Sequence, residues 1–193
     1  AELAFRPGLP IAYDLGLTAL SAVVAVLVCG LGLGIALRKA PNSAAFGGAV
    51  VGLGVGAMHY TGMAALHLPA TAQWDVVYVI ASLVISTVFS SLAMIAASRG
   101  SELLRLLGTG LLVLAIVGLH FTAMAAVSFM PDPTVAMPAQ AISPEWLAVA
   151  IAAITLLIIS LGLVGSIVDH HLAERSAGEA AHLREHVAAL EAT

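Results

Sequence analysis

Two segments of the 193-residue chain carry a histidine and a methionine four positions apart. The first pair is His59 and Met63, and the second is His120 and Met124. On a helix this spacing places both side chains on one face, one turn apart. Neutral imidazole and thioether sulfur suit copper, especially Cu(I), better than Mg, Ca or Mn. The four side chains therefore predict a copper site built from both segments.

Each histidine lies in a long apolar run, where a polar side chain is costly and is commonly functional. The alternative for His59 and His120 is that neighbouring helices or water satisfy them as buried polar residues. Two axial imidazoles from facing helices would also suit a haem. Methionine on an apolar helix usually fills the core, so Met63 and Met124 stand out only because they recur at the same offset.

Two further groups of side chains are candidates for a supporting role at this site. Met58 is a possible additional ligand, with packing as its alternative. His67 has no matching histidine in the second segment, so it is either an outer-surface ligand or simply solvated. Asp14 and Asp75 each precede an apolar run, and each would either hydrogen-bond a ligand imidazole or cap the start of a helix.

The composition indicates a membrane protein, since hydrophobic residues make up 61% of the chain and charged residues only 9%. Five predominantly apolar runs are long enough to cross a bilayer as helices. They cover residues 15–37, 44–68, 76–98, 103–129 and 146–168. The predicted fold is thus an all-α, polytopic transmembrane bundle with five spans.

Several classes of function are excluded by the same sequence. Cys29 is the single cysteine, so neither a disulfide framework nor a cysteine-based metal site is available. The seven Lys and Arg residues form no basic cluster, which excludes nucleic acid as a partner. Because no catalytic triad, phosphate-binding loop or pair of carboxylates is visible, we do not expect an enzyme.

The chain also contains an internal repeat of helix pairs with a period of 61 residues. The matching positions are Tyr13 and Trp74, Asp14 and Asp75, and His59 and His120. The opening residues AELAF align with the end of a further copy, so we expect two more spans in the parent protein, seven in all. Repeated helix pairs in membranes often build one site at their pseudo-symmetry axis.

Glycine spacing and basic residues predict how the spans pack and face. Gly48, Gly52 and Gly56 leave one bare helix face, which allows another helix to approach closely. Arg and Lys residues lie in the turns near residues 38–39 and 99–105, and the positive-inside rule places these turns in the cytoplasm. Both histidine segments then lie near the periplasmic face of a bacterial inner membrane.

The last 25 residues differ in composition from the membrane domain, residues 1–168. Residues 169–193 are charged and alanine-rich, and they predict a cytoplasmic linker helix. Leu183, Val187 and Leu190 follow the spacing of a short coiled coil, which predicts a homodimer.

Residues 58–61, Met-His-Tyr-Thr, and their echo Leu-His-Phe-Thr at 119–122 resemble the motif that names the MHYT domain. That family is a bacterial integral-membrane sensor module, and the resemblance covers residues 1–170. It implies that the motif histidines and methionines bind copper and thereby sense O2, CO or NO. It also implies a cytoplasmic output module, such as a cyclic di-GMP synthase, a phosphodiesterase or a histidine kinase. The alternatives are a haem-binding cytochrome, a copper-handling oxidoreductase or transporter, and a metal-free helix-packing module.

Overall fold

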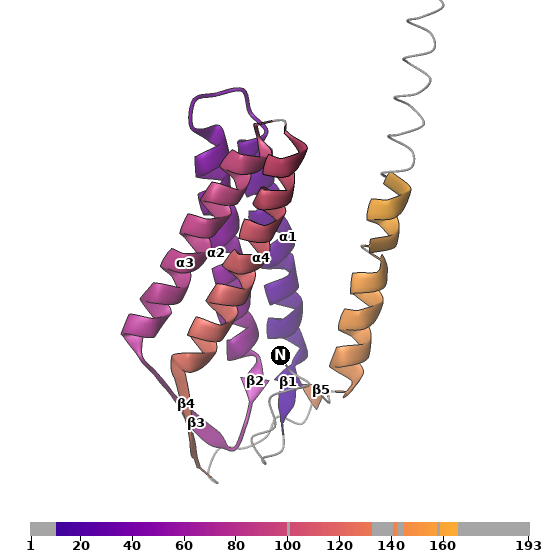
Figure 1. Cartoon of the computed structure of the whole chain (residues 1–193). Coiled ribbons are helices and arrows are strands. Elements are labelled where there is room, and N and C mark those ends of the chain that lie inside the picture. Colours follow the sequence, from indigo (N-terminus) through magenta and orange to yellow (C-terminus); the bar gives the residue numbers. More distant parts are fainter. Residues whose placement is uncertain (1–10, 100, 133–140, 143–144, 158, 166–193) are drawn as a thin grey trace, which may run out of the picture. The chain divides into compact units, whose positions relative to one another are not determined.

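The computed structural model describes residues 11–99, 101–132, 141–142, 145–157 and 159–165 (Figure 1). The chain divides into two units, Ala1–Pro144 and Glu145–Thr193. The first unit contains four long helices, α1 (Leu15–Ala36), α2 (Ser43–Ala64), α3 (Val76–Ala97) and α4 (Glu102–Ala125). The second unit contains a helix over Glu145–Gly165. The all-α bundle is confirmed, whereas the predicted linker helix and its coiled coil lie outside the described residues.

Four helices are long and apolar enough to cross a membrane, namely α1, α3, α4 and Glu145–Gly165. The remaining predicted span, residues 44–68, corresponds to α2. This helix has the same length as α1 and α3 and no charged residue, but it is not among these four. Its six glycines, together with His59 and Tyr60, lower its mean hydropathy. Because α2 packs against α1 on one side and α3 on the other, neighbouring helices rather than lipid cover much of its surface.

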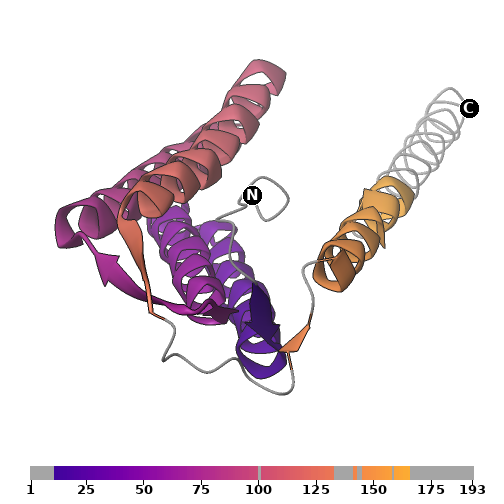
Figure 2. The same ribbon diagram turned by 90° about the horizontal axis from the view of Figure 1, so that it is seen from below.

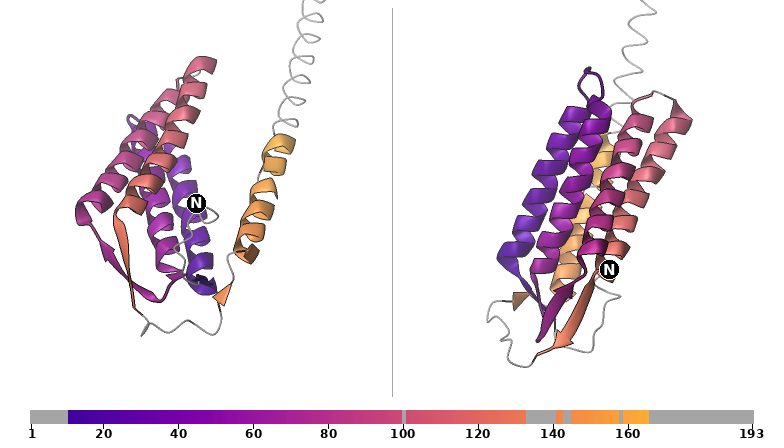
Figure 3. Two further views of the ribbon diagram at one scale, coloured as in Figure 1. Left: turned by 60° about the horizontal axis from the view of Figure 1, so that its bottom comes forward. Right: turned by 90° about the vertical axis from the view of Figure 1, so that its left-hand side faces the viewer.

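The four helices of the first unit pack in chain order, α1 on α2, α2 on α3 and α3 on α4. Figure 2 views the bundle from below and shows the α1–α2 pair meeting the α3–α4 pair. The two views in Figure 3 agree with this order. Val51, Val55 and Leu119 form the buried apolar cluster between α2 and α4. The contact of α2 with α3 is therefore the main junction between the two helix pairs.

This junction is unusually close because glycine lies on one side and serine on the other. A Cβ atom on Gly52 would lie 2.6 Å from the carbonyl oxygen of Ser86. The Ser86 hydroxyl donates a hydrogen bond to the Gly52 carbonyl at 3.0 Å. The predicted close approach at the glycine face is thus confirmed. We call this contact the α2–α3 seam, formed by Gly48, Gly52 and Gly56 on α2 and Ser82, Ser86 and Ser90 on α3.

Short strands connect the helices at the end of the bundle where α2 and α4 finish. Strands β1 (Ala12–Asp14), β2 (Leu66–His67) and β5 (Ala141–Ile142) form a three-stranded antiparallel sheet with β1 in the middle. Strands β3 (Ala70–Trp74) and β4 (Val127–Pro131) form a two-stranded antiparallel sheet. The residues after α2 form β2, which pairs with β1, and the residues after α4 form β4, which pairs with β3. Each of these two helices therefore ends about one turn earlier than predicted.

The strands repeat with the same period as the sequence. Tyr13 pairs with Leu66, and Trp74 pairs with Val127 in the other sheet. The backbone N–H of Asp14 donates to the carbonyl of Ala65 at 2.9 Å. The equivalent bond, from Asp75 to Ala126, measures 2.8 Å. Every one of these positions is shifted by 61 residues, so the internal repeat extends to individual backbone hydrogen bonds.

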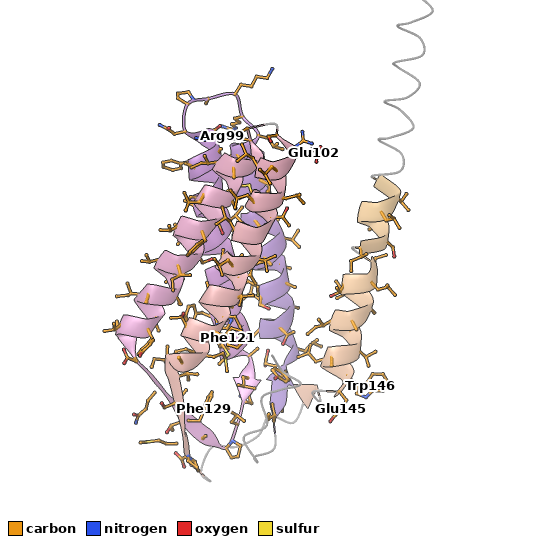
Figure 4. All side chains as sticks on the ribbon, viewed as in Figure 1. Arg99, Glu102, Phe121, Phe129, Glu145 and Trp146 are labelled. Atoms are coloured by element: carbon orange, nitrogen blue, oxygen red, sulfur yellow. The ribbon has the colours of Figure 1, made fainter. Side chains whose placement is uncertain are left out.

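The strands and the basic turns lie at opposite ends of the four-helix unit. The carboxyl ends of α2 and α4 lead into the strands at one end (Figure 1). Arg99, in the turn between α3 and α4, and Glu102, the first residue of α4, lie at the other end (Figure 4). Both histidine segments are therefore at the end of the bundle away from this basic turn, as the sequence predicted.

Candidate metal centre

The structure brings His59 of α2 and His120 of α4 together. Their ring centroids are 5.4 Å apart and their planes are inclined at 85°, an edge-to-face contact. Both α2 and α4 run towards the strands, and the 61-residue period places the two histidines at the same depth. We call these two residues the histidine pair. The repeat therefore generates one site from two helices that are not consecutive in the chain.

One atom of this pair lacks a protein partner. The Nε2 atom of His59 is buried, and it neither donates nor accepts a hydrogen bond within the described part of the chain. A buried polar atom without a partner costs free energy and calls for an explanation such as an ion or a water molecule. The alternative in which neighbouring helices satisfy His59 does not account for this atom.

The methionines predicted as ligands occupy two different settings. Met63 and Met124 lie one helical turn beyond the histidines, on α2 and α4, and both are half-buried. Met58 packs against the cluster of Val51, Val55 and Leu119, which is the packing alternative predicted for it. The first two remain predicted thioether ligands, whereas packing already explains the position of Met58.

The remaining predicted residues lie in the strands or at helix starts. His67 is half-buried in β2, paired with Ala12. Asp14 accepts a hydrogen bond from the Leu17 amide at 2.8 Å, and Asp75 accepts one from the Val77 amide at 2.9 Å. Both carboxylates thus cap helices. Among the described residues neither carboxylate accepts a hydrogen bond from an imidazole, and that role remains a prediction.

The donor atoms near the pair are soft or neutral. Within the described ranges, no group of three or more His, Cys, Asp and Glu side chains converges. Cys29 lies on α1 and its sulfur is 3.8 Å from the Val51 carbonyl oxygen. A site formed by two imidazoles, with methionine sulfur as the available supplement, fits Cu(I) and does not fit Mg, Ca or a cysteine-rich zinc centre.

Tyr60 is the residue at this site whose role sequence reasoning missed. Its ring lies edge-on to His59, with centroids 5.3 Å apart, and to Trp74 at 5.6 Å. Its phenol oxygen is 2.7 Å from Oγ of Ser82 on α3. The equivalent residue, Phe121, has no hydroxyl, and its side chain is 68% exposed near the strand end of α4 (Figure 4). The four-residue spacing of serines on α3 was the available signal.

A family model described as the MHYT bacterial signalling protein N terminal repeat matches residues 1–49 and 52–110. The chain belongs to the MHYT family. The two matched segments end 61 residues apart, at the same offset as the strand pairs and the histidine pair. The MHYT repeat of the family model is therefore the repeat that the backbone displays.

Relatives of this MHYT domain are signalling proteins. It is 36% identical over 181 residues to an uncharacterized signaling protein of Caulobacter vibrioides. It is 36% identical over 182 residues to the bifunctional diguanylate cyclase/cyclic di-GMP phosphodiesterase MucR of Pseudomonas aeruginosa. It is 34% identical over 135 residues to the cyclic di-GMP phosphodiesterase NbdA of the same species.

These alignments cover 93%, 90% and 65% of the chain but only 22%, 27% and 17% of the respective relatives. No solved structure matches this MHYT chain. The apolar helices and the family together establish an integral-membrane signalling domain.

Proposed function

We propose that this MHYT domain is a sensor that binds copper between His59 and His120, with Met63 and Met124 as additional ligands. The observation that carries the proposal is the contact of the two imidazoles, whose ring centroids are 5.4 Å apart, with the Nε2 atom of His59 buried and without a partner among the described residues. A metal ion held by that nitrogen would supply the missing interaction. The histidine pair belongs to two helix pairs, so a bound ion would link them.

Copper would supply a redox-active centre with room for a diatomic gas such as O2, CO or NO. The protein would contribute the rest. The imidazoles of His59 and His120 would hold the ion, and the Val51, Val55 and Leu119 cluster excludes water from the neighbouring part of the bundle. The methionine sulfurs favour the reduced ion. The sensed quantity is accordingly a gas or the redox state of the medium.

A haem held by the same two histidines is the main alternative. The rings touch edge to face, so a macrocycle between them would require α2 and α4 to separate. A single ion is far smaller than a macrocycle, which favours copper. An absorption spectrum of the purified protein separates the two, because a haem protein shows a Soret band and a copper protein does not.

The names of two relatives indicate the output. MucR makes or degrades cyclic di-GMP and NbdA degrades it. We infer that the parent of this chain couples the domain to a cytoplasmic cyclic di-GMP module through residues 169–193, as a homodimer. The histidine pair then faces the periplasm from the bacterial inner membrane, since the basic turn between α3 and α4 lies at the other end of the bundle.

The test is elemental analysis of the full chain purified in detergent after growth with copper. We expect copper in stoichiometric amounts in the wild type, and a large loss in His59→Ala and in His120→Ala. His182→Ala is the control, because it removes a histidine from the charged segment 169–193, outside the membrane domain. Equal copper in the wild type and both pair variants would refute the site.

The sensing step has its own test in the copper-loaded protein. Carbon monoxide binds Cu(I), so it should add an infrared C–O stretching band in the wild type. We expect no such band in His59→Ala or in the protein treated with a Cu(I) chelator. A band of equal intensity in the variant would show that the gas binds elsewhere.

A further inference from the structure

Tyr60 lies beside the histidine pair, and the proposed copper site gives it no role. It follows His59 directly on α2, and its ring fills the space between His59 and the indole of Trp74. Its phenol reaches across the α2–α3 seam to Ser82, whose side chain is fully buried. Tyr60 is thus anchored to a different helix from the one that carries it, right next to a predicted ligand.

The direction of this hydrogen bond follows from the partners of Ser82. The Ser82 hydroxyl donates to the carbonyl of Val79 at 2.8 Å. A serine hydroxyl has one hydrogen to donate, so Ser82 receives the hydrogen of Tyr60 at 2.7 Å. The chain of donors runs from the phenol of Tyr60 through Ser82 to the backbone of α3.

The repeat provides an internal comparison. Ser21 on α1 is the equivalent of Ser82, and it makes the same bond, to the Thr18 carbonyl at 2.8 Å. On α4, Phe121 replaces Tyr60, and its ring is 5.4 Å from that of His120. The hydroxyl anchor therefore exists beside His59 and is absent beside His120.

We propose that Tyr60 is a positioning residue that fixes the imidazole of His59, while His120 is left free to adjust. The proposal rests on the proposed copper site, because the value of a fixed imidazole lies in the ion it would hold. A ligand pair with one fixed and one adjustable member accommodates two coordination states without moving both helix pairs. The asymmetry between Tyr60 and Phe121 is then functional rather than incidental.

Copper affinity provides the first test, measured on the full chain by competition with a Cu(I) chelator. We expect Tyr60→Phe and Ser82→Ala each to weaken binding about tenfold, as for other outer partners of metal ligands. The double variant should lose no more than either single one, because both changes break the same hydrogen bond. Ser21→Ala is the matched control and should bind as the wild type does. Wild-type affinity in Tyr60→Phe, or an equal loss in Ser21→Ala, would overturn the proposal.

The second test uses the metal-free protein, so its outcome does not depend on copper. With ¹⁵N-labelled histidine, the His59 signal is identified by its disappearance in His59→Ala. Tyr60→Phe should shift or broaden this signal, and Ser21→Ala should not. If the wild type binds no copper but the His59 signal responds as expected, the metal site fails and the positioning role stands. An unchanged His59 signal in Tyr60→Phe refutes the positioning role in either case.

Discussion

The α2–α3 seam makes Gly52 the most informative single position for a change of packing. A Cβ atom there would lie 2.6 Å from the Ser86 carbonyl oxygen and 2.6 Å from Cα of Thr87. Both are backbone atoms, so no side-chain rotation can make room. Because ordinary carbon contacts begin near 3.5 Å, Gly52→Ala would push α2 and α3 apart by about 1 Å.

Opposing effects determine the magnitude of this change. Alanine in place of glycine favours a helix by about 1 kcal/mol. Overpacking of a closely packed contact costs about 1–3 kcal/mol. The Ser86 hydroxyl would also lose its acceptor on α2, at a cost of about 0.5–1.5 kcal/mol. We therefore expect Gly52→Ala to lower the free energy of unfolding by about 0.5–3.5 kcal/mol.

Reversible unfolding of the full chain in mixed micelles, followed by circular dichroism, measures this difference. Gly30→Ala on α1 is the matched control, because a Cβ atom there meets nothing within 4 Å. We expect the control to be as stable as the wild type or more so. If Gly52→Ala matched this control, α2 and α3 would not approach as closely as the structure shows, and the reasoning would be refuted.

Three further predictions concern single side chains. His59→Leu should leave the metal-free protein as stable as the wild type or about 1 kcal/mol more stable, because it removes a buried nitrogen that has no partner among the described residues. A clear loss of stability in thermal unfolding would show that the His59 imidazole does have a hydrogen-bond partner. Asp14→Ala and Asp75→Ala should each lower the free energy of unfolding by about 1 kcal/mol through loss of a helix cap, and the copper content should not change. Loss of copper would instead support a role for these carboxylates as hydrogen-bond partners of the imidazoles. Ser86→Ala should lower the free energy of unfolding by about 1 kcal/mol, because it removes the hydrogen bond to α2. Ser91→Ala should have little effect, because the Ser91 hydroxyl bonds to its own helix. Equal losses in the two variants would show that the hydrogen bond between the helices does not contribute to stability.

The repeat explains why so much of this architecture could be predicted from one sequence. Asp14 with Asp75 and His59 with His120 recur at one offset, so the pairs had to occupy equivalent places. The four-residue spacing of Gly48, Gly52 and Gly56 revealed a close helix contact. Period and spacing can be obtained from the sequence alone. They were enough to locate the helices and to predict that the two histidines lie at the same depth.

Contacts between helices could not be obtained in that way. The bond from Tyr60 to Ser82 depends on which helix packs on which, and spacing along either helix does not specify that. The strands were missed because Leu66 and His67 make a strand only through pairing with β1, and such short segments have no periodicity of their own. The low mean hydropathy of α2 did not prevent its prediction as a span, and it is explained by the packing, since protein rather than lipid surrounds much of this helix.

The strand hydrogen bonds reduce the ways in which the bundle can move. The bond from Asp14 to Ala65 joins the start of α1 to the end of α2, while a short turn joins their other ends. The bond from Asp75 to Ala126 does the same for α3 and α4. Each helix pair is thus joined at both ends, and we expect it to move as one body. The softest remaining degree of freedom is shear of one body past the other along α2 and α3. His59 and His120 belong to different helix pairs, so an ion bound to both of them would act on this shear motion.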